Sequence, residues 1–285
     1  MKTVAMWFRP VRWGAALLGL AVLTSMLYTT RAESVSASAD QLDLVIQPIL
    51  SEEKTRRAYR PLAEYLSRAT GRQVVIRTMP NFLAYWTSIR RPNSFSFVLD
   101  AAHFTDYRVN KLGYEVLAKI PDTVSYSLIV PEDVLVFEPS ELIGKRIATL
   151  GSPSIGAARL AAMFPNPMRQ PIIVEVGSSE KGMQMLLQGK VHAAILPTPL
   201  VFRQMSGAGG ISVVMTTEPI PHIALSASGS VDPELRKAVR KALIEADKTP
   251  EGRAMLKKIG FPKFDPANAG IYAGQSDMLK KYWGY

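Results

Sequence analysis

The sequence predicts an α/β protein built from two units of alternating strands and helices. The chain has 285 residues, which is enough for about two domains. Hydrophobic residues make up 47% of it, and Gly (19) and Pro (20) occur near their ordinary frequencies. This composition excludes a disordered, collagen-like or coiled-coil chain. Short apolar runs alternate with amphipathic stretches, as is typical of sheets covered by helices.

The first 39 residues have the layout of a secretory signal. Three basic residues precede an apolar run over residues 14–28, and small residues follow it. Cleavage is expected at Ala32 or, with a better A-x-A pattern, at Ala39. A membrane-spanning helix needs about 20 apolar residues, so this shorter run favours cleavage over the alternative, retention as a membrane anchor. We therefore expect a periplasmic protein.

The first unit of the mature chain begins with a buried strand over residues 42–46. Ser51 then caps a helix that carries Glu52 and Glu53 in its first turn, and Gly71 ends it. The expected elements that follow are a strand over 73–78, a helix over 82–89, a strand over 94–100 and a helix over 102–112. This alternation predicts a parallel sheet with helices on both faces.

A second unit begins near Tyr126. Its expected strands cover 125–131, 145–150, 171–176, 192–196 and 211–216, and its expected helices cover 139–142, 155–164 and 178–188. The chain then continues with a strand over 222–228, a helix that begins at Asp232-Pro233, and another that begins at Thr249.

These units suggest two lobes that share a cleft. We expect lobe one to comprise residues 40–125 and 217–285, and lobe two to comprise 126–216. The chain would cross between them at Ser125–Ser127 and at Thr216–Pro221. Ligands of open α/β sheets bind at the carboxyl ends of the strands, so the cleft is the expected binding site.

Charge and residue usage restrict the function further. The formal net charge of +10 favours anionic binding partners. An exported protein seldom meets nucleic acid, and no alternating basic and aromatic motif is present, so the excess charge indicates a solvated surface with a bias towards an anionic ligand. The chain has no Cys, which excludes disulfides, thiolate metal sites and a cysteine nucleophile.

No catalytic constellation is apparent in the sequence. The three histidines, His103, His192 and His222, show no i, i+3 or i, i+4 spacing of the kind found in metal sites. A serine hydrolase is disfavoured because no G-x-S-x-G motif is present. We therefore expect a binding protein rather than an enzyme, without a metal or cofactor.

Four motifs span the mature chain: RPLAEYLSRATGRQVVIRTM (60–79), SELIGKRIATLGSPSIG (140–156), GKVHAAIL (189–196) and TPEGRAMLKKIGFPKF (249–264). In sequence and in order they resemble motifs of the phosphate/phosphonate-type periplasmic binding proteins. The resemblance implies a type 2 periplasmic-binding fold, with a central mixed sheet in each lobe and two crossing strands. It also implies a small anionic ligand, such as a phosphate or phosphonate, that is delivered to the membrane permease of an ABC importer. An open alternative is a sensory module of the same fold that signals to a membrane receptor or kinase.

The resemblance points to two helix starts in lobe two. One is the turn with Ser152, Ser154, Ile155 and Gly156, where hydroxyl and backbone N–H groups suit an anion. The other is Ser178-Ser179. In both places the open alternative is that the serines only cap the helix. Pro153 and Ile155 replace hydroxyl residues of the family motif, which weakens the expected binding of a phosphonate at this turn.

The remaining candidate ligand contacts come from both lobes, and they are Asn81, Phe82, His103, Phe104, Tyr126 and Thr198. Phe82 and Phe104 stand where the family has tyrosine, and Thr198 follows a strand where aminoalkylphosphonate binders carry acidic or polar residues. The pocket should therefore be less polar and less acidic than those of relatives. A zwitterionic aminophosphonate is not the expected ligand.

Overall fold

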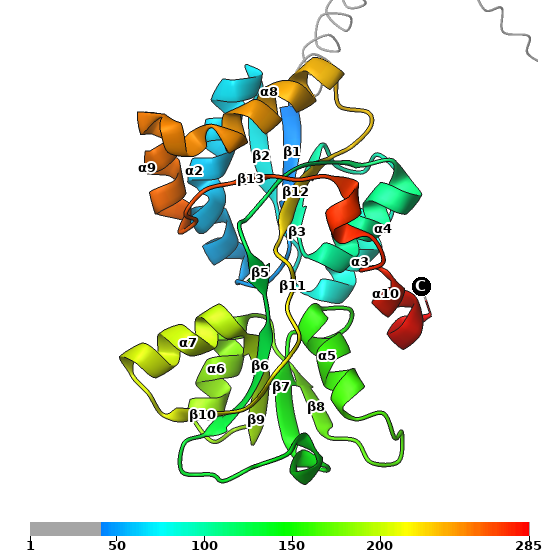
Figure 1. Ribbon diagram of the computed structural model, residues 1–285, viewed down its shortest axis with the longest axis vertical. Coiled ribbons are helices and arrows are strands. Elements are labelled where there is room, and N and C mark those ends of the chain that lie inside the picture. The colour runs from blue at the N-terminus through cyan, green and yellow to red at the C-terminus, as the bar shows by residue number, and fades with distance from the viewer. Residues whose placement is uncertain (1–40, 285) are drawn as a thin grey trace, which may run out of the picture. The chain divides into compact units, whose positions relative to one another are not determined.

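The structure is a computed structural model that describes residues 41–284, in which two mixed sheets are each flanked by helices (Figure 1). The predicted secretory signal lies outside the described residues. None of the helices between residues 41 and 284 combines the length and the apolar character needed to cross a membrane.

The larger sheet has six strands and is mixed. In spatial order they are β13 (Asp265–Pro266), β4 (Glu115–Lys119), β12 (Ala224–Ala227), β3 (Phe97–Asp100), β1 (Gln41–Ile46) and β2 (Gln73–Arg77). β1 and β3 pair in parallel, whereas β12 runs antiparallel to both β3 and β4. The expectation of a parallel sheet was therefore wrong here, because β12 returns from the far part of the chain in the opposite direction.

Helices cover both faces of this sheet (Figure 1). They are α2 (Glu52–Thr70), α3 (Phe82–Ile89), α4 (Ala102–Leu112), α8 (Pro233–Ile244) and α9 (Pro250–Ile259). Successive strand residues point to opposite faces. Leu44 accordingly joins one buried cluster with Leu62 of α2, and Val45 joins another with Phe104 of α4.

The helix ends follow the capping residues predicted from the sequence. Ser51 Oγ accepts a hydrogen bond from the backbone N–H of Lys54, and Gly71 ends α2 in the left-handed conformation at φ 66°. Asp232 caps α8 in front of Pro233, and Thr249 caps α9 in front of Pro250. Because these signals are local, the bounds of the helices were readable from the sequence.

The smaller sheet has five strands and is also mixed. In spatial order they are β10 (Ile211–Thr216), β6 (Tyr126–Pro131), β9 (Ala193–Pro197), β7 (Arg146–Thr149) and β8 (Ile172–Glu175). β7 pairs in parallel with β8 and β9, and β6 pairs antiparallel with β9 and β10. Its helices are α5 (Ile155–Met163), α6 (Ser179–Leu187) and α7 (Thr198–Gly207), and a 3-10 turn, η1 (Pro139–Leu142), precedes β7.

Two short strands connect the sheets. β5 (Thr123–Val124) leads into β6, β11 (Ile220–Pro221) follows β10, and the two pair antiparallel. The predicted crossings at Ser125–Ser127 and Thr216–Pro221 adjoin or overlap this pair. The proposed lobe boundaries stay a prediction. After α9 the chain adds η3 (Ala269–Tyr272) and α10 (Asp277–Trp283).

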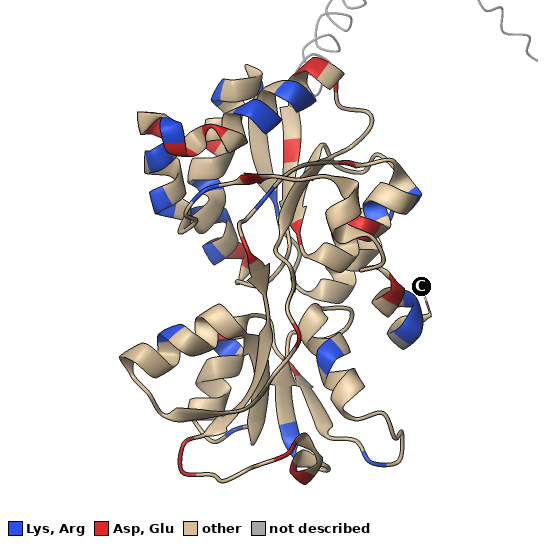
Figure 2. Cartoon of the chain, in the orientation of Figure 1, with Lys and Arg blue, Asp and Glu red and all other residues tan. Residues whose placement is uncertain are grey.

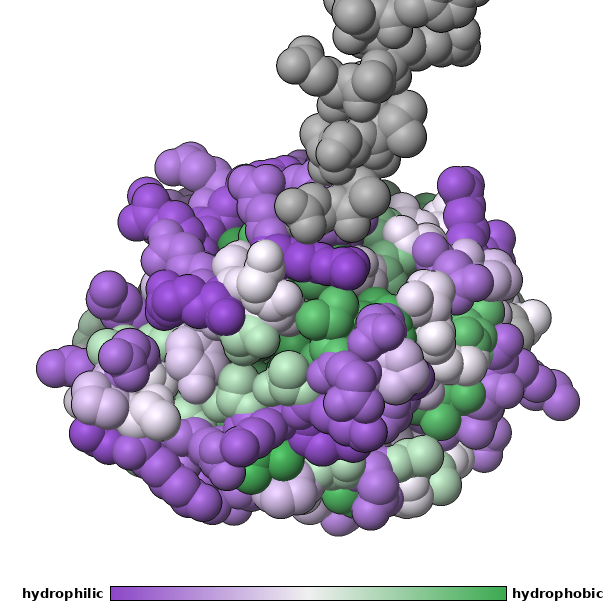
Figure 3. Space-filling model, turned by 90° about the horizontal axis from the view of Figure 1, so that it is seen from above, coloured by the Kyte–Doolittle hydropathy of each residue, from purple (hydrophilic) through white to green (hydrophobic). Residues whose placement is uncertain are grey.

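Seen from the end at which β1 begins, the helices present a mainly hydrophilic surface around a smaller apolar area (Figure 3). Lys and Arg residues gather on α2, α8 and α9 (Figure 2). These outer helices of the six-stranded sheet thus carry a large share of the basic side chains, as expected for a solvated surface.

Candidate functional site

A cavity of about 480 Å³ lies where strand ends of the two sheets meet. Gln47 follows β1, Ala101 follows β3, and Pro197 ends β9, and all three line the cavity. Gln47 is fixed by its Oε1, which accepts a hydrogen bond from Ala101 N at 3.1 Å, so its NH2 group is left as a donor. The position at the carboxyl ends of strands is the one where α/β folds bind ligands.

Two residues predicted for the site, Tyr126 and Ser179, line this cavity. Tyr126 begins β6 and is 7% exposed. Gly156 of α5 lies against its ring, since a Cβ built on Gly156 would be in ordinary van der Waals contact with Tyr126 Cδ1 at 3.5 Å. Burial raises the pKa of the Tyr126 phenol well above its ordinary value, so the hydroxyl remains protonated and can donate a hydrogen bond.

Ser179 is the first residue of α6 and carries an unsatisfied hydroxyl. Its side chain is 2% exposed, and its Oγ has no hydrogen-bond partner among the described residues. Capping of α6 is done by the neighbouring Ser178, whose Oγ accepts from Lys181 N at 3.1 Å. A buried polar group without a partner costs about 1–3 kcal/mol. The Ser179 hydroxyl therefore requires an explanation, and a bound ligand would provide one.

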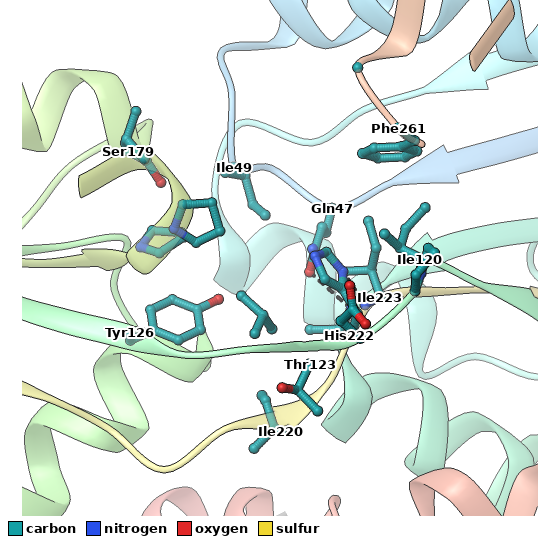
Figure 4. A pocket seen from close by; sticks show the side chains of 18 of the residues that line it. Gln47, Ile49, Ile120, Thr123, Tyr126, Ser179, Ile220, His222, Ile223 and Phe261 are labelled. Atoms are coloured by element: carbon teal, nitrogen blue, oxygen red, sulfur yellow. Dashed lines mark hydrogen bonds between the residues drawn. The ribbon is translucent and has the colours of Figure 1, made fainter. Parts of the chain in front are cut away.

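Figure 4 shows how these groups are placed. The side chains of Ser179 and Tyr126, both from the five-stranded sheet and its helices, point into the cavity, and Gln47 lies opposite them. The hydroxyls of Ser179 and Tyr126 and the NH2 group of Gln47 thus supply three hydrogen-bond donors from both sheets. A small acceptor-rich ligand suits this arrangement.

Most of the remaining wall is apolar. Tyr59 of α2 and Phe261, which follows α9, contribute rings whose centroids are 6.1 Å apart. Further apolar lining residues are Ile49, Leu50, Ile120, Ile220, Ile223 and several prolines. Burial raises the pKa of the Tyr59 phenol to about 12.

Few charged groups border the cavity. Glu180 pairs with Lys54, whereas Asp122 and Arg203 are exposed. His222 accepts a hydrogen bond at Nδ1 from Ile223 N, at 2.8 Å. Burial, helped by the positive charge of Lys119, lowers the pKa of His222 to about 4, so this imidazole is neutral at pH 7.

The start of α5 does not line the cavity, and Gly156 only lies against the Tyr126 ring. Ser154 Oγ accepts from Ala157 N at 3.2 Å and so caps the helix, and Ile155 is buried. Ser152 lines a separate hollow of about 320 Å³, together with Glu175. The structure therefore does not gather the predicted turn residues around one ligand position.

The predicted residues of α3 and α4 form an aromatic cluster beside the cavity rather than its wall. Asn81 caps α3 by accepting from Ala84 N at 2.8 Å. Phe82 and Phe104 are buried and stack with their ring centroids 6.0 Å apart. His103 is fully buried, its Nε2 lies 2.9 Å from Pro153 O, and burial lowers its pKa to about 4. The His103–Pro153 contact joins α4 to the turn before α5.

Thr198 also makes an internal contact. Its Oγ1 lies 2.9 Å from Ser127 Oγ, and its N donates to Ser125 O at 2.9 Å. It begins α7, between Pro197 and Pro199, which do line the cavity. Thr198 therefore shapes the wall from behind.

Most of the cavity residues were not anticipated from the sequence, and Gln47, Tyr59, His222 and Phe261 are among them. Gln47 could have been predicted from the rule that ligands bind at strand ends, because it directly follows the first strand. Tyr59 and Phe261 are 202 positions apart, and no local pattern indicates that they meet. Among residues 41–284, no group of three or more His, Cys, Asp or Glu side chains is placed to hold a metal ion.

Comparison with known proteins gives a family and several similar folds. Residues 44–272 match the family described as ABC transporter, phosphonate, periplasmic substrate-binding protein. PhnD1 of Prochlorococcus marinus, solved with methylphosphonate, superposes with a TM-score of 0.75 at 13% identity, over 86% of this chain and 99% of that one. No curated protein sequence gives a match.

Two further solved structures are similar. A binding protein component of an ABC phosphonate transporter from Pseudomonas aeruginosa has a TM-score of 0.70 at 14% identity, over 85% of this chain and 84% of that one. A Xanthomonas citri protein, solved bound to ATP, has a TM-score of 0.68 at 14% identity, over 85% and 98% of the two chains. At these identities the likeness confirms the predicted fold, with two mixed sheets and crossing strands.

Proposed function

The chain belongs to the phosphonate periplasmic substrate-binding proteins of ABC transporters, with their type 2 periplasmic-binding fold, and from this premise we propose that its ligand is a small phosphonate-like oxyanion. The family binds substrates without chemical conversion, so the chain is not an enzyme. In the proposed function the ligand is held in the cavity between the sheets and handed to the permease of an importer. A periplasmic location follows from the family, and we propose that residues 1–39 direct export.

The unpartnered Ser179 hydroxyl carries the oxyanion proposal. It is buried at the start of α6, where the helix dipole favours negative charge. Tyr126 and Gln47 add donors at the same cavity. A phosphonate offers three oxygens, so it can accept hydrogen bonds from more than one of these donors, and charge-assisted hydrogen bonds are the stronger kind.

The arrangement of the two sheets supports a clamp mechanism. We propose that the sheets with their helices are the two lobes, with boundaries at residues 125/126 and 216/217. Backbone rotation in a few residues near the β5–β11 pair would then open and close the cavity. Ser179 N donates to Ile49 O at 3.0 Å, so α6 contacts the six-stranded side when the clamp is closed.

Calorimetric titration of the exported protein with methylphosphonate and inorganic phosphate tests the proposal. We expect binding of at least one of them, and replacement of Ser179 by Ala should weaken it about ten- to hundred-fold, because a hydrogen bond to a charged group contributes about 1.5–3 kcal/mol.

Thr249→Ala is the matched control. Thr249 also sits at a helix start, but its Oγ1 accepts from Gly252 N at 3.0 Å, away from the cavity. This variant should lose stability and keep its affinity. Absence of binding of either anion by the unmodified protein would contradict the oxyanion assignment.

A further inference from the structure

The cavity that we propose for the oxyanion is much larger than the anionic group needs. Methylphosphonate has five non-hydrogen atoms, which occupy roughly 150 Å³ at a water-like share of about 30 Å³ each. The cavity of about 480 Å³ is three times that size. Unless the ligand carries a further group, most of the cavity would stay filled with water against an apolar wall.

The space away from Ser179 and Tyr126 is bordered mainly by aromatic and aliphatic side chains, with Gln47 and His222 as the polar residues among them (Figure 4). Ser179 and Tyr126 lie at one side of the cavity, and Phe261, Ile120 and Ile223 lie at the other (Figure 4). The Phe261 ring is tilted by 59° against that of Tyr59, with centroids 6.1 Å apart, which is a favourable aromatic geometry. An apolar substituent attached to an oxyanion at Ser179 would therefore reach an apolar surface.

An ammonium group finds no suitable partner in the same place. Of the two carboxylates that border the cavity, Glu180 is already paired with Lys54 of α2, and Asp122 is exposed at the rim. His222 lies beside Ile223 and is neutral at pH 7. Burial of an unpaired cation is costly, so an amino-substituted phosphonate would lose free energy on entering this end.

From this division of the cavity we propose that the ligand is an organic oxyanion with an apolar, ring-sized substituent, and that Tyr59 and Phe261 select it. The inference rests on the proposed function, because it takes the oxyanion position at Ser179 as given. It names the substrate class of the same site, in which the donors hold the charged end and the two rings hold the organic end.

A series of four anions tests this proposal by calorimetric titration: inorganic phosphate, methylphosphonate, 2-aminoethylphosphonate and benzylphosphonate. We expect benzylphosphonate to bind about ten- to hundred-fold more tightly than methylphosphonate, because it buries a ring that otherwise faces water. 2-Aminoethylphosphonate should bind no more tightly than methylphosphonate.

Substitutions of Phe261 and Tyr59 test whether these two rings cause the preference for benzylphosphonate. Phe261→Ala should weaken the binding of benzylphosphonate about ten-fold more than it weakens the binding of methylphosphonate. Phe261→Leu, which keeps apolar packing, and Tyr59→Leu provide second variants in case the alanine variant fails to fold. Phe137→Ala is the control, since Phe137 is 78% exposed and borders no part of the cavity.

The outcomes separate this inference from the function on which it rests. Binding of phosphate or methylphosphonate without a preference for benzylphosphonate would leave the proposed function intact and overturn the inference. A preference that persists in the Phe261 and Tyr59 variants would overturn the assignment to these rings. Failure of all four anions to bind would overturn the proposed function and the inference together.

Discussion

Ser154 and Ser179 lie at the starts of neighbouring helices of the same sheet but have different partners. Ser154 Oγ accepts a backbone hydrogen bond from Ala157, whereas Ser179 Oγ has no partner among the described residues and faces the cavity. The sequence left open whether each serine caps a helix or contacts the ligand. In our proposal, Ser154 caps α5 and Ser179 contacts the ligand. Ser178 takes the capping position of α6 and leaves its neighbour available.

This difference predicts opposite effects of two similar substitutions. Ser154→Ala should lower the free energy of unfolding by about 1 kcal/mol, because it removes a helix cap, and should leave the affinity for methylphosphonate unchanged. Ser179→Ala should weaken binding and cost little stability, because its hydroxyl has no internal bond to lose. Thermal melting and calorimetric titration of both variants check this. A Ser154→Ala protein with normal stability and lost affinity would return the anion site to the start of α5.

The buried His103 and the half-buried His222 make stability depend on pH. Burial lowers the pKa of both His103 and His222 to about 4, from the ordinary value of 6.5. Between these values the unfolded chain binds a proton that the folded chain does not, so stability falls as the pH drops from 6.5 towards 4 and is fully present above 6.5. Each histidine contributes a slope of up to about 1.4 kcal/mol per pH unit.

Melting curves between pH 4 and pH 8 test this prediction. The variants His222→Asn, which can mimic the acceptor Nδ1, and His103→Gln, which can mimic Nε2, should show a flatter dependence in this range. An equally steep loss of stability in the double variant would show that other groups, such as carboxylates, cause it.

At the scale of elements, the sequence predicted the parts that local signals define. The helix of Phe82–Ile89 and that of Ala102–Leu112 have the predicted bounds, and η1 has them as well. β4 and α7 were not predicted. β4 is a short segment with charged ends, and α7 begins directly after β9 with a proline in its first turn, so neither has a separate signal. The antiparallel placement of β12 depends on pairing between distant segments, which local patterns do not encode.

The residues of the candidate site also fall into those that local signals predict and those that depend on tertiary packing. Tyr126 and Ser179 could be named in advance because each begins an element at a strand end or helix start. Tyr59 lies within α2 and Phe261 lies after α9, and they meet only because those two helices pack together. Asn81, Phe82 and Phe104 also begin or adjoin elements, but the tertiary packing of α3 and α4 uses their side chains for a cap and a core.

Helix α9 gives a physical reason for the Pro-Glu-Gly-Arg motif. A Cβ built on Gly252 would lie 2.1 Å from the carbonyl oxygen of Ala246, in the 3-10 turn η2 (Ala246–Lys248). Because the obstacle is backbone, it cannot rotate aside. Gly252→Ala should therefore lower the free energy of unfolding by about 1–3 kcal/mol, the usual cost of overpacking.

The matched control for this prediction is Gly207→Ala, at the end of α7. Gly207 is also helical, but nothing lies within 4 Å of a Cβ built there. That variant should be neutral or more stable by about 0.5–1 kcal/mol, because alanine restricts the unfolded chain. Chemical denaturation of both variants compares the two glycines directly, and equal effects would contradict the packing argument.

At the scale of the whole molecule, several contacts among residues 41–284 join the elements of the two sheets beyond the connecting strands. α10 packs against α5, and three polar contacts are His103 Nε2 with Pro153 O, Ser179 N with Ile49 O, and Lys54 Nζ with Glu180. Two of the three involve the first residues of α6, which are also the residues nearest to the proposed oxyanion. We therefore propose that ligand binding and closure are coupled through the same helix start, because an anion bound at Ser179 would hold α6 where it contacts the six-stranded side.

This coupling predicts the behaviour of a variant that lacks one contact, Glu180→Gln. Lys54 and Glu180 are 48% and 43% exposed, and an ion pair of this kind contributes only about 0–1 kcal/mol. Its loss should shift the ligand-free protein towards the open form by at most about five-fold in the equilibrium constant. Small-angle X-ray scattering should then show a larger radius of gyration for Glu180→Gln than for the unmodified protein without ligand, and the same smaller radius for both at saturating ligand.

If the unmodified protein keeps its radius when ligand is added, the two sheets do not act as a clamp. If only the variant fails to close, the Lys54–Glu180 pair does more than its exposure implies, and the closed form depends on it directly.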